Sequence, residues 1–176
     1  MESKMENKTE NIMRKIKLSK VTLNCGAGTD QNKLERSIRL LELIGEGKAV
    51  KTFAKRRIPA FGLRPGLAIG CKITLRKEKA QRILEKLLVT VGNKLSSKQI
   101  NPGSFAFGIK EYIEIPGLSF KRDIGILGFD VCVALERAGK KVKEKKIKRG
   151  KIPKRQKITK EETIQFIKEK FNLEIN

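Results

Sequence analysis

The residue types that most often carry out catalysis are absent or scattered in this sequence. Histidine is missing, which removes the usual general base near neutral pH, the Ser-His and Cys-His nucleophile pairs and the commonest metal ligand. Glu111 and Glu114 are three positions apart in an expected strand, so their carboxylates point to opposite faces and cannot flank one bond. Asp30, Asp123 and Asp130 show no clustering suited to magnesium. We therefore predict no catalytic residues, no metal and no cofactor.

The three cysteines and one glycine turn are the other groups in the sequence that could carry chemistry. Cys25, Cys71 and Cys132 lie tens of residues apart without a CxxC pair, which argues against a zinc site or a disulfide framework. Each lies in an apolar run, so we expect three buried structural thiols in an intracellular protein. The Gly26-Ala27-Gly28 turn could present amides to a phosphate. It lacks the remaining glycines of a dinucleotide motif, and a tight strand-to-helix turn is the simpler interpretation.

The net charge points to a polyanionic partner. The 176 residues include 41 Lys plus Arg and 19 Asp plus Glu, a formal charge of +22. Half of this charge lies between Arg137 and Lys157, where twelve basic residues accompany one acid, Glu144. A charge this large attracts nucleic acid or an anionic membrane surface.

The segment from Arg137 to Lys157, called the extension below, favours nucleic acid over membrane. Its apolar residues Val142, Ile147 and Ile152 are spaced five apart, which does not form the apolar face of a membrane-surface helix. Its glycines and proline predict that it has no structure of its own and orders only on RNA. A merely solvated run of charge is the alternative. The residues we expect to bind RNA here are Lys140, Lys141, Lys145, Lys146, Lys148, Arg149, Lys154 and Arg155.

Periodicity predicts one α+β domain with a largely antiparallel sheet, helices packed on one face, and a basic C-terminal extension ending in a short helix. Adjacent strands without intervening helices exclude a purely parallel fold. Thr29 or Asp30 is expected to cap the first helix, and Gly45 and Gly47 to end it. The expected strands are 16–25, 49–54, 69–76, 105–115 and 129–135, and the expected helices follow residue 30, span 77–91 and begin after a capping box at Thr159 and Glu162.

Two predicted surfaces could contact RNA. The polar sides of two alternating strands make a basic sheet face, which is either an RNA platform or a solvated surface; its residues are Lys20, Thr22, Asn24, Lys72, Thr74 and Arg76. The loop 55–66 carries Lys55, Arg56, Arg57 and Arg64, which can pair with phosphates. Phe61 in this loop can stack on a base or, alternatively, pack into the core.

Four segments together resemble one protein family. They are KVTLNCGAG (20–28), KTFAKRRIPAFGLRPGLAIGCKITLR (51–76), FAFGIKEYIEIPGLSF (105–120) and GILGFDVCVAL (125–135). The chain from about residue 13 to residue 176 resembles the large-subunit ribosomal protein that binds 5S rRNA, the universal L-five family, in its archaeal and eukaryotic branch. Because the family begins near the first strand, Met5 and Met13 are alternative starts to Met1.

The resemblance implies a structural, non-enzymatic protein of the ribosome in the cytoplasm. Such a protein helps attach 5S rRNA in the central protuberance, beside other 5S-associated proteins and large-subunit rRNA. It also touches P-site tRNA and bridges to the small-subunit head protein S-thirteen. The family pattern has Gly-Gln-x-Pro after the first helix, whereas this chain has Gly45-Glu46-Gly47-Lys48, so a carboxylate replaces an amide there.

The resemblance also assigns roles to residues. For 5S rRNA it implies Asn24, Phe61 and Thr74 with their neighbours Lys20, Thr22, Lys72 and Arg76. For tRNA it implies Lys55, Arg56, Arg57 and Arg64, and for the intersubunit bridge the connection 120–127. We divide the chain into a polar N-terminal tail (1–12), an α+β RNA-binding core (13–136) and the basic extension with its C-terminal helix (137–176). A DNA-compacting module and an RNA-modifying enzyme are the competing hypotheses, and neither accounts for four family-like segments in order.

Overall fold

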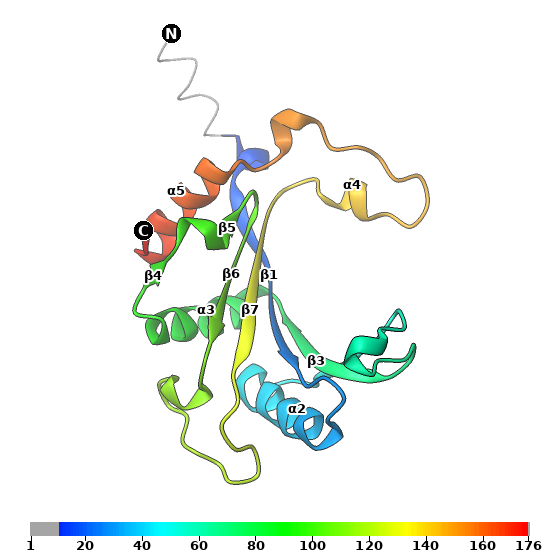
Figure 1. Ribbon diagram of the computed structural model, residues 1–176. Helices are drawn as coiled ribbons and strands as arrows, with labels where there is room; N and C mark the ends of the chain where they lie inside the picture. The colour runs from blue at the N-terminus through cyan, green and yellow to red at the C-terminus, as the bar shows by residue number, and fades with distance from the viewer. Residues whose placement is uncertain (1–10, 176) are drawn as a thin grey trace.

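The protein is built on one six-stranded sheet, as the computed structural model shows for residues 11–175 (Figure 1). The strand order is β2-β3-β1-β7-β6-β5, and every pairing in this sheet is antiparallel. The strands are β1 (Ile16–Gly26), β2 (Val50–Phe53), β3 (Ala68–Leu75), β5 (Ile100–Asn101), β6 (Ser104–Ile109) and β7 (Phe129–Arg137), and β4 (Lys94–Leu95) and β8 (Glu174–Ile175) form a separate parallel pair. The helices are α2 (Gln31–Gly45), α3 (Lys77–Thr90), α4 (Lys141–Glu144) and α5 (Lys160–Phe171). The predicted α+β class is confirmed.

The helix ends follow from local chemistry. Asp30, rather than Thr29, caps α2, because its Oδ1 accepts the amides of Asn32 at 2.9 Å and Lys33 at 3.1 Å. The capping box predicted at the start of α5 is present. We expected glycines to end α2, but Glu46 takes the left-handed conformation there, with φ of 47°. Gly45 is instead buried, and a Cβ at this position would lie 2.6 Å from Ile73 Cδ1.

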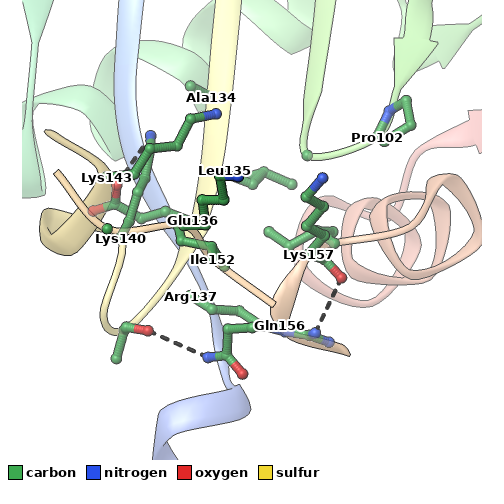
Figure 2. Close-up of a pocket in the computed structure, with 15 residues that line it drawn as sticks. Pro102, Ala134, Leu135, Glu136, Arg137, Lys140, Lys143, Ile152, Gln156 and Lys157 are labelled. Carbon is green, nitrogen blue, oxygen red and sulfur yellow. Dashed lines mark hydrogen bonds and ion pairs between the residues drawn. The ribbon is translucent and has the colours of Figure 1, made fainter. Parts of the chain in front are cut away.

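The extension leaves the sheet after β7 and returns to it before α5 (Figure 1). The sequence predicts no structure here, yet the segment contains the short helix α4 and a 3-10 turn at Lys154–Gln156. Its ends are fixed: Gln156 Nε2 donates to the carbonyl of Ala138 at 3.3 Å (Figure 2) and to that of Met13 at 3.0 Å. Between these ends, the amides of residues 146–149 donate to no backbone carbonyl in the described part of the chain. The extension is therefore an arm anchored at its base.

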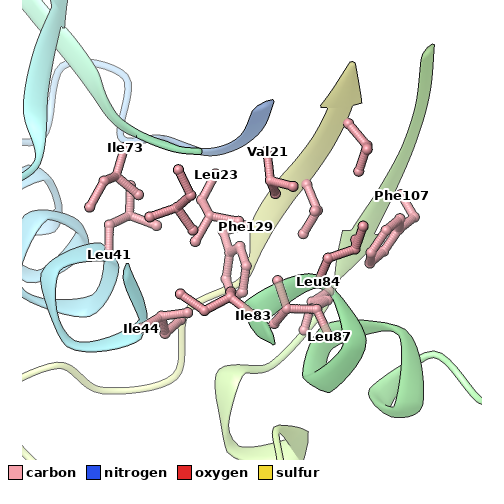
Figure 3. Close-up of a cluster of buried hydrophobic side chains, with 14 of the residues drawn as sticks. Val21, Leu23, Leu41, Ile44, Ile73, Ile83, Leu84, Leu87, Phe107 and Phe129 are labelled. Atoms are coloured by element: carbon pink, nitrogen blue, oxygen red, sulfur yellow. The ribbon is translucent and has the colours of Figure 1, made fainter. Parts of the chain in front are cut away.

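The core lies between the sheet and the long helices (Figure 3). α2 packs on β3 and β1, and α3 packs on β1. Alternate residues of β1, β3, β6 and β7 enter this layer, as period-two patterns require. The C-terminal helix α5 also contributes, through the fully buried Ile167. Core side chains include Val21, Leu23, Leu41, Ile44, Ile73, Ile83, Leu84, Leu87, Phe107 and Phe129.

One predicted strand is too long, and three very short strands were missed. The strand expected over 105–115 ends at Ile109, and a 3-10 turn follows at Tyr112–Glu114. Tyr112 is fully buried, and its hydroxyl accepts the Lys121 amide at 2.9 Å. This contact turns the chain back, which alternation alone does not reveal. β4, β5 and β8 have two residues each and are too short to show a period.

The predicted N-terminal tail (1–12) falls almost wholly outside the described residues, as do Met1 and Met5. The chain is described from Asn11, whose side chain accepts the Met13 amide at 2.9 Å. A 3-10 turn at Ile12–Arg14 then leads into β1.

Candidate RNA-binding surface

Within residues 11–175, one face of the sheet is covered by no helix, and it is called the open face below. On β1 and β3, Thr22 lies directly opposite Thr74, and Asn24 lies opposite Lys72. Val21 and Leu23, which alternate with these residues, are buried completely on the other side. The register therefore brings the polar side chains predicted from two separate strands into one continuous surface.

Positive charge dominates the β1 and β3 half of the open face. Lys72 and Arg76 are exposed and Lys20 is half-buried, so all three are open to solvent. Arg76 follows β3 with extended backbone and precedes α3. Two carboxylates of β7 lie beside β1 on this face, Asp130 opposite Asn24 and Glu136 opposite Lys17, and Glu136 is already paired with Lys140. Basic side chains around neutral hydroxyl and amide groups suit contacts with phosphates and sugars.

The β6 and β7 half of the open face was not predicted as part of the site. Cys132 and Ala134 on β7 lie opposite Thr22 and Lys20, and Ala106 on β6 lies opposite Cys132. These residues are small, so this half is smooth and lets a partner approach the strands closely. The sequence could have indicated this surface, because the alternation that buries Val131 and Val133 turns Cys132 and Ala134 outward. Two further small residues on this half are Ser104 and Gly108.

The expectation of three buried cysteines is wrong for Cys132, which is exposed. Alternation along β7 turns it to the open face, and this outweighs the preference of thiols for the interior. Desolvation by its surroundings and the nearby Asp130 raise the pKa of the Cys132 thiol. Cys25 and Cys71 are buried as predicted, lie opposite each other on β1 and β3, and are free thiols. Burial raises the pKa of Cys71 to about 12, so it stays protonated.

The loop 55–66 projects from the sheet between β2 and β3 (Figure 1). Its outer part is closed by paired hydrogen bonds between Ile58 and Leu63, at 3.0 and 3.1 Å. Phe61 lies at the tip in a 3-10 turn and is 71% exposed, so it does not pack into the core. It lies on this projection rather than on the sheet itself. The basic residues Lys55, Arg56, Arg57 and Arg64 are all exposed beside it.

The connection 120–127 presents apolar side chains to solvent. Phe120 is 53% exposed and Ile126 64% exposed. Ile124 between them is buried and anchors the loop, together with the bond from the Lys121 amide to Tyr112. Exposed apolar residues on an anchored loop are typical of a protein contact rather than of an RNA contact.

Other kinds of site find little support in the described residues. No three potential metal ligands among the described side chains come together. Across residues 11–175, none of the helices combines the length and apolar character needed to cross a bilayer.

The extension carries its eight predicted basic residues on its surface, all exposed except the half-buried Lys140.

The open face is basic and is flanked by a basic loop and a basic arm. These features define the class of protein: an α+β protein that contacts nucleic acid over a wide surface. Two family profiles match the chain, the one described as ribosomal protein L5 at residues 11–64 and the one described as the C-terminus of the same ribosomal family at residues 68–166. The chain therefore belongs to the ribosomal protein L5 family, as its sequence segments suggested.

Relatives from archaea extend this similarity over nearly the whole chain. The large ribosomal subunit protein uL5 of Archaeoglobus fulgidus is 44% identical over 167 residues, covering 95% of this chain and 93% of that protein. The uL5 of Methanosphaera stadtmanae is 40% identical over 166 residues, covering 94% of this chain and 99% of that protein. The uL5 of Nanoarchaeum equitans is 44% identical over 167 residues, covering 94% of this chain and 99% of that protein. This chain is accordingly a structural constituent of the large ribosomal subunit, acts in translation and is not an enzyme.

Proposed function

We propose that the open face binds 5S rRNA and helps attach it in the central protuberance of the large subunit. The in-register rows of β1 and β3 support this, because Thr74 lies between Lys72 and Arg76 on β3 and Asn24 lies directly opposite Lys72. Folded RNA is contacted through phosphates, 2′-hydroxyls and exposed base edges. Lysines and arginines can pair with the phosphates, and the hydroxyl and amide side chains among them can hydrogen-bond to 2′-hydroxyls and base edges.

The loop 55–66 reaches P-site tRNA in this proposal. Phe61, which the resemblance groups with the 5S contacts, lies on this loop and is exposed, so we assign its ring to stacking on a base or sugar of the tRNA; the arginines around it can pair with phosphates. Because the loop extends beyond the sheet, it can contact a second RNA while the open face holds 5S rRNA (Figure 1).

Surface chemistry supports the remaining partners of this proposal. The anchored loop with Phe120 and Ile126 exposed is suited to the bridge with the small-subunit head protein S-thirteen. The extension, with its exposed lysines and arginines, would bind large-subunit rRNA. Other 5S-associated ribosomal proteins are further partners in this proposal.

A neutral double variant tests the 5S site. Asn24→Ala with Thr74→Ala removes two hydrogen-bonding side chains from the centre of the open face without changing charge. We expect 5S affinity to fall about tenfold, since each lost bond costs about 0.5–1.5 kcal/mol, with the fold intact by circular dichroism. The matched control, Asn32→Ala with Thr90→Ala, removes the same side-chain types from α2 and α3 and should leave binding unchanged. Unchanged 5S affinity in the first variant would move the RNA site off the sheet.

A further inference from the structure

A cleft of about 640 Å³ lies where β7 leaves the sheet, between that strand and the extension (Figure 2). Ala134 of β7 and Ile152 of the extension give it apolar walls. Ala134 also belongs to the open face, where it lies opposite Lys20. The cleft is therefore continuous with the surface proposed to hold RNA, and its volume falls in the range of about 300–1,000 Å³ typical of small-ligand sites.

The charges around the cleft favour an anion. Five basic side chains and a single carboxylate, Glu136, line it. That carboxylate is already paired with Lys140 Nζ at 3.3 Å. Within residues 11–175, Lys143, Lys151 and Lys157 have no carboxylate within ion-pairing distance. In Figure 2, Lys143 and Lys157 flank the β7 segment that crosses the cleft.

A buried arginine adds a hydrogen-bond donor. The Arg137 side chain is only 9% exposed, and its Nη2 pairs with Glu162 Oε1 at 2.7 Å. Its Nη1 donates to the Lys157 carbonyl at 3.4 Å. The buried Nε has no hydrogen-bond partner among the described residues. Since buried donors in folded proteins are nearly always satisfied and Arg137 lines the cleft, this guanidinium adds positive charge and an unused donor to the wall of the cleft.

We propose that the cleft holds one unpaired nucleotide of the bound RNA, its phosphate between Lys143 and Lys157 and its base against Ala134 and Ile152. This inference rests on the RNA-binding role proposed above. The apolar walls suit the base of a nucleotide, and the basic side chains around them suit its phosphate. A base inside a duplex cannot reach the walls, whereas a bulged or loop nucleotide can be turned outward. Gly150, which lines the cleft, lets the arm fold tightly on itself, because a Cβ there would lie 2.6 Å from Val142 Cγ1.

Two RNA hairpins that differ in a single bulged 2-aminopurine nucleotide test the cleft. We expect the full-length protein to bind the bulged hairpin about tenfold more tightly than the fully paired one, as one or two charge-assisted contacts would give. The fluorescence of the bulged base should change on binding. In the double variant Lys143→Ala with Lys157→Ala this preference should disappear, while the Lys157 carbonyl stays available to Arg137.

The matched control is Lys146→Ala with Lys154→Ala, which removes the same charge from exposed positions of the extension that do not line the cleft. It should weaken binding of both hairpins equally and retain the preference. A third variant, Ile152→Ser, keeps the charge and should lose the preference without changing the salt dependence. Equal affinity of the unmodified protein for the two hairpins, or the same preference in both lysine variants, would overturn the cleft assignment. Neither outcome bears on selectivity for 5S rRNA, whose loss would instead refute the proposed function.

Discussion

Removing the three basic side chains of the open face should weaken 5S rRNA binding far more than removing three from the helix side. The first variant is Lys20→Ala, Lys72→Ala and Arg76→Ala. The second is Arg39→Ala, Arg82→Ala and Lys86→Ala, residues of α2 and α3 on the opposite side of the molecule; both variants lose three positive charges.

The magnitude follows from the strand geometry. Lys72 and Arg76 are four positions apart on one extended segment, which separates them by about 13 Å at the usual strand rise. They can therefore meet different phosphates, and Lys20 on the neighbouring strand can meet a third. Each phosphate contact contributes about 0.7–0.9 to the slope of log affinity against log salt, or about fivefold in affinity near 0.15 M salt. Without these three phosphate contacts, binding should be about a hundredfold weaker and the slope smaller by about 2–3.

The helix-side variant should lose much less. At about 0.15 M salt the screening length is about 8 Å, so charges behind the helical layer contribute little to RNA lying on the open face. Filter binding of labelled 5S rRNA at several salt concentrations measures both affinity and slope. If the two triple variants weakened binding equally and reduced the slope equally, net charge rather than the open face would hold the RNA, and the reasoning would be refuted.

Further predictions concern the loop, the arm and the sheet. Phe61→Ala should leave the unfolding free energy within about 0.5 kcal/mol, because the ring is 71% exposed, yet weaken tRNA binding measured by titration; a stability loss without a tRNA effect would contradict the assignment. Partial burial tends to raise the pKa of Glu162, but the Thr159 amide and the Arg137 guanidinium outweigh it and hold the pKa below its ordinary value. Stability should therefore fall as the pH drops below about 5, and Glu162→Gln should flatten that part of the denaturation profile; an unchanged profile in this variant would exclude the ion pair as the cause. Gly70→Ala should destabilise the protein by about 1–3 kcal/mol, because a Cβ there would lie 2.7 Å from the Cys25 carbonyl oxygen. Gly108→Ala, with only an ordinary 3.5 Å contact to Asp130 Oδ1, should be tolerated in the same urea titration. Amide exchange of residues 146–149 should slow only when large-subunit RNA is bound, and equal protection in the free and bound protein would count against an arm that orders on RNA.

The sequence predicts the sheet and its helical cover because both depend on local periodicity. Val21 and Leu23 alternate with Thr22, so the buried and open sides of β1 are evident from the residue pattern alone. The same rule applied to β7 places Cys132 outward, and the error arose from weighting thiol burial above alternation. Polar positions on β1 and β3 could thus be predicted, as could the exposed basic residues of the loop.

What could not be predicted depends on contacts between distant residues. The pairing of Thr22 with Thr74 requires the strand order, which local patterns do not specify. The cleft forms because Gln156 and Arg137 fix the returning arm beside β7, and these bonds join segments that show no common pattern. The end of β6 at Ile109 depends likewise on the burial of Tyr112 against a later loop.

The central claim, selective binding of 5S rRNA, is tested most directly by competition. Labelled 5S rRNA is titrated with the full-length protein in a filter-binding assay at two salt concentrations, with excess tRNA and excess duplex DNA added separately. The account predicts binding that resists both competitors and has a moderate salt slope. If duplex DNA competes as well as unlabelled 5S rRNA and the slope is steep, the +22 charge alone accounts for the binding and the claim is contradicted.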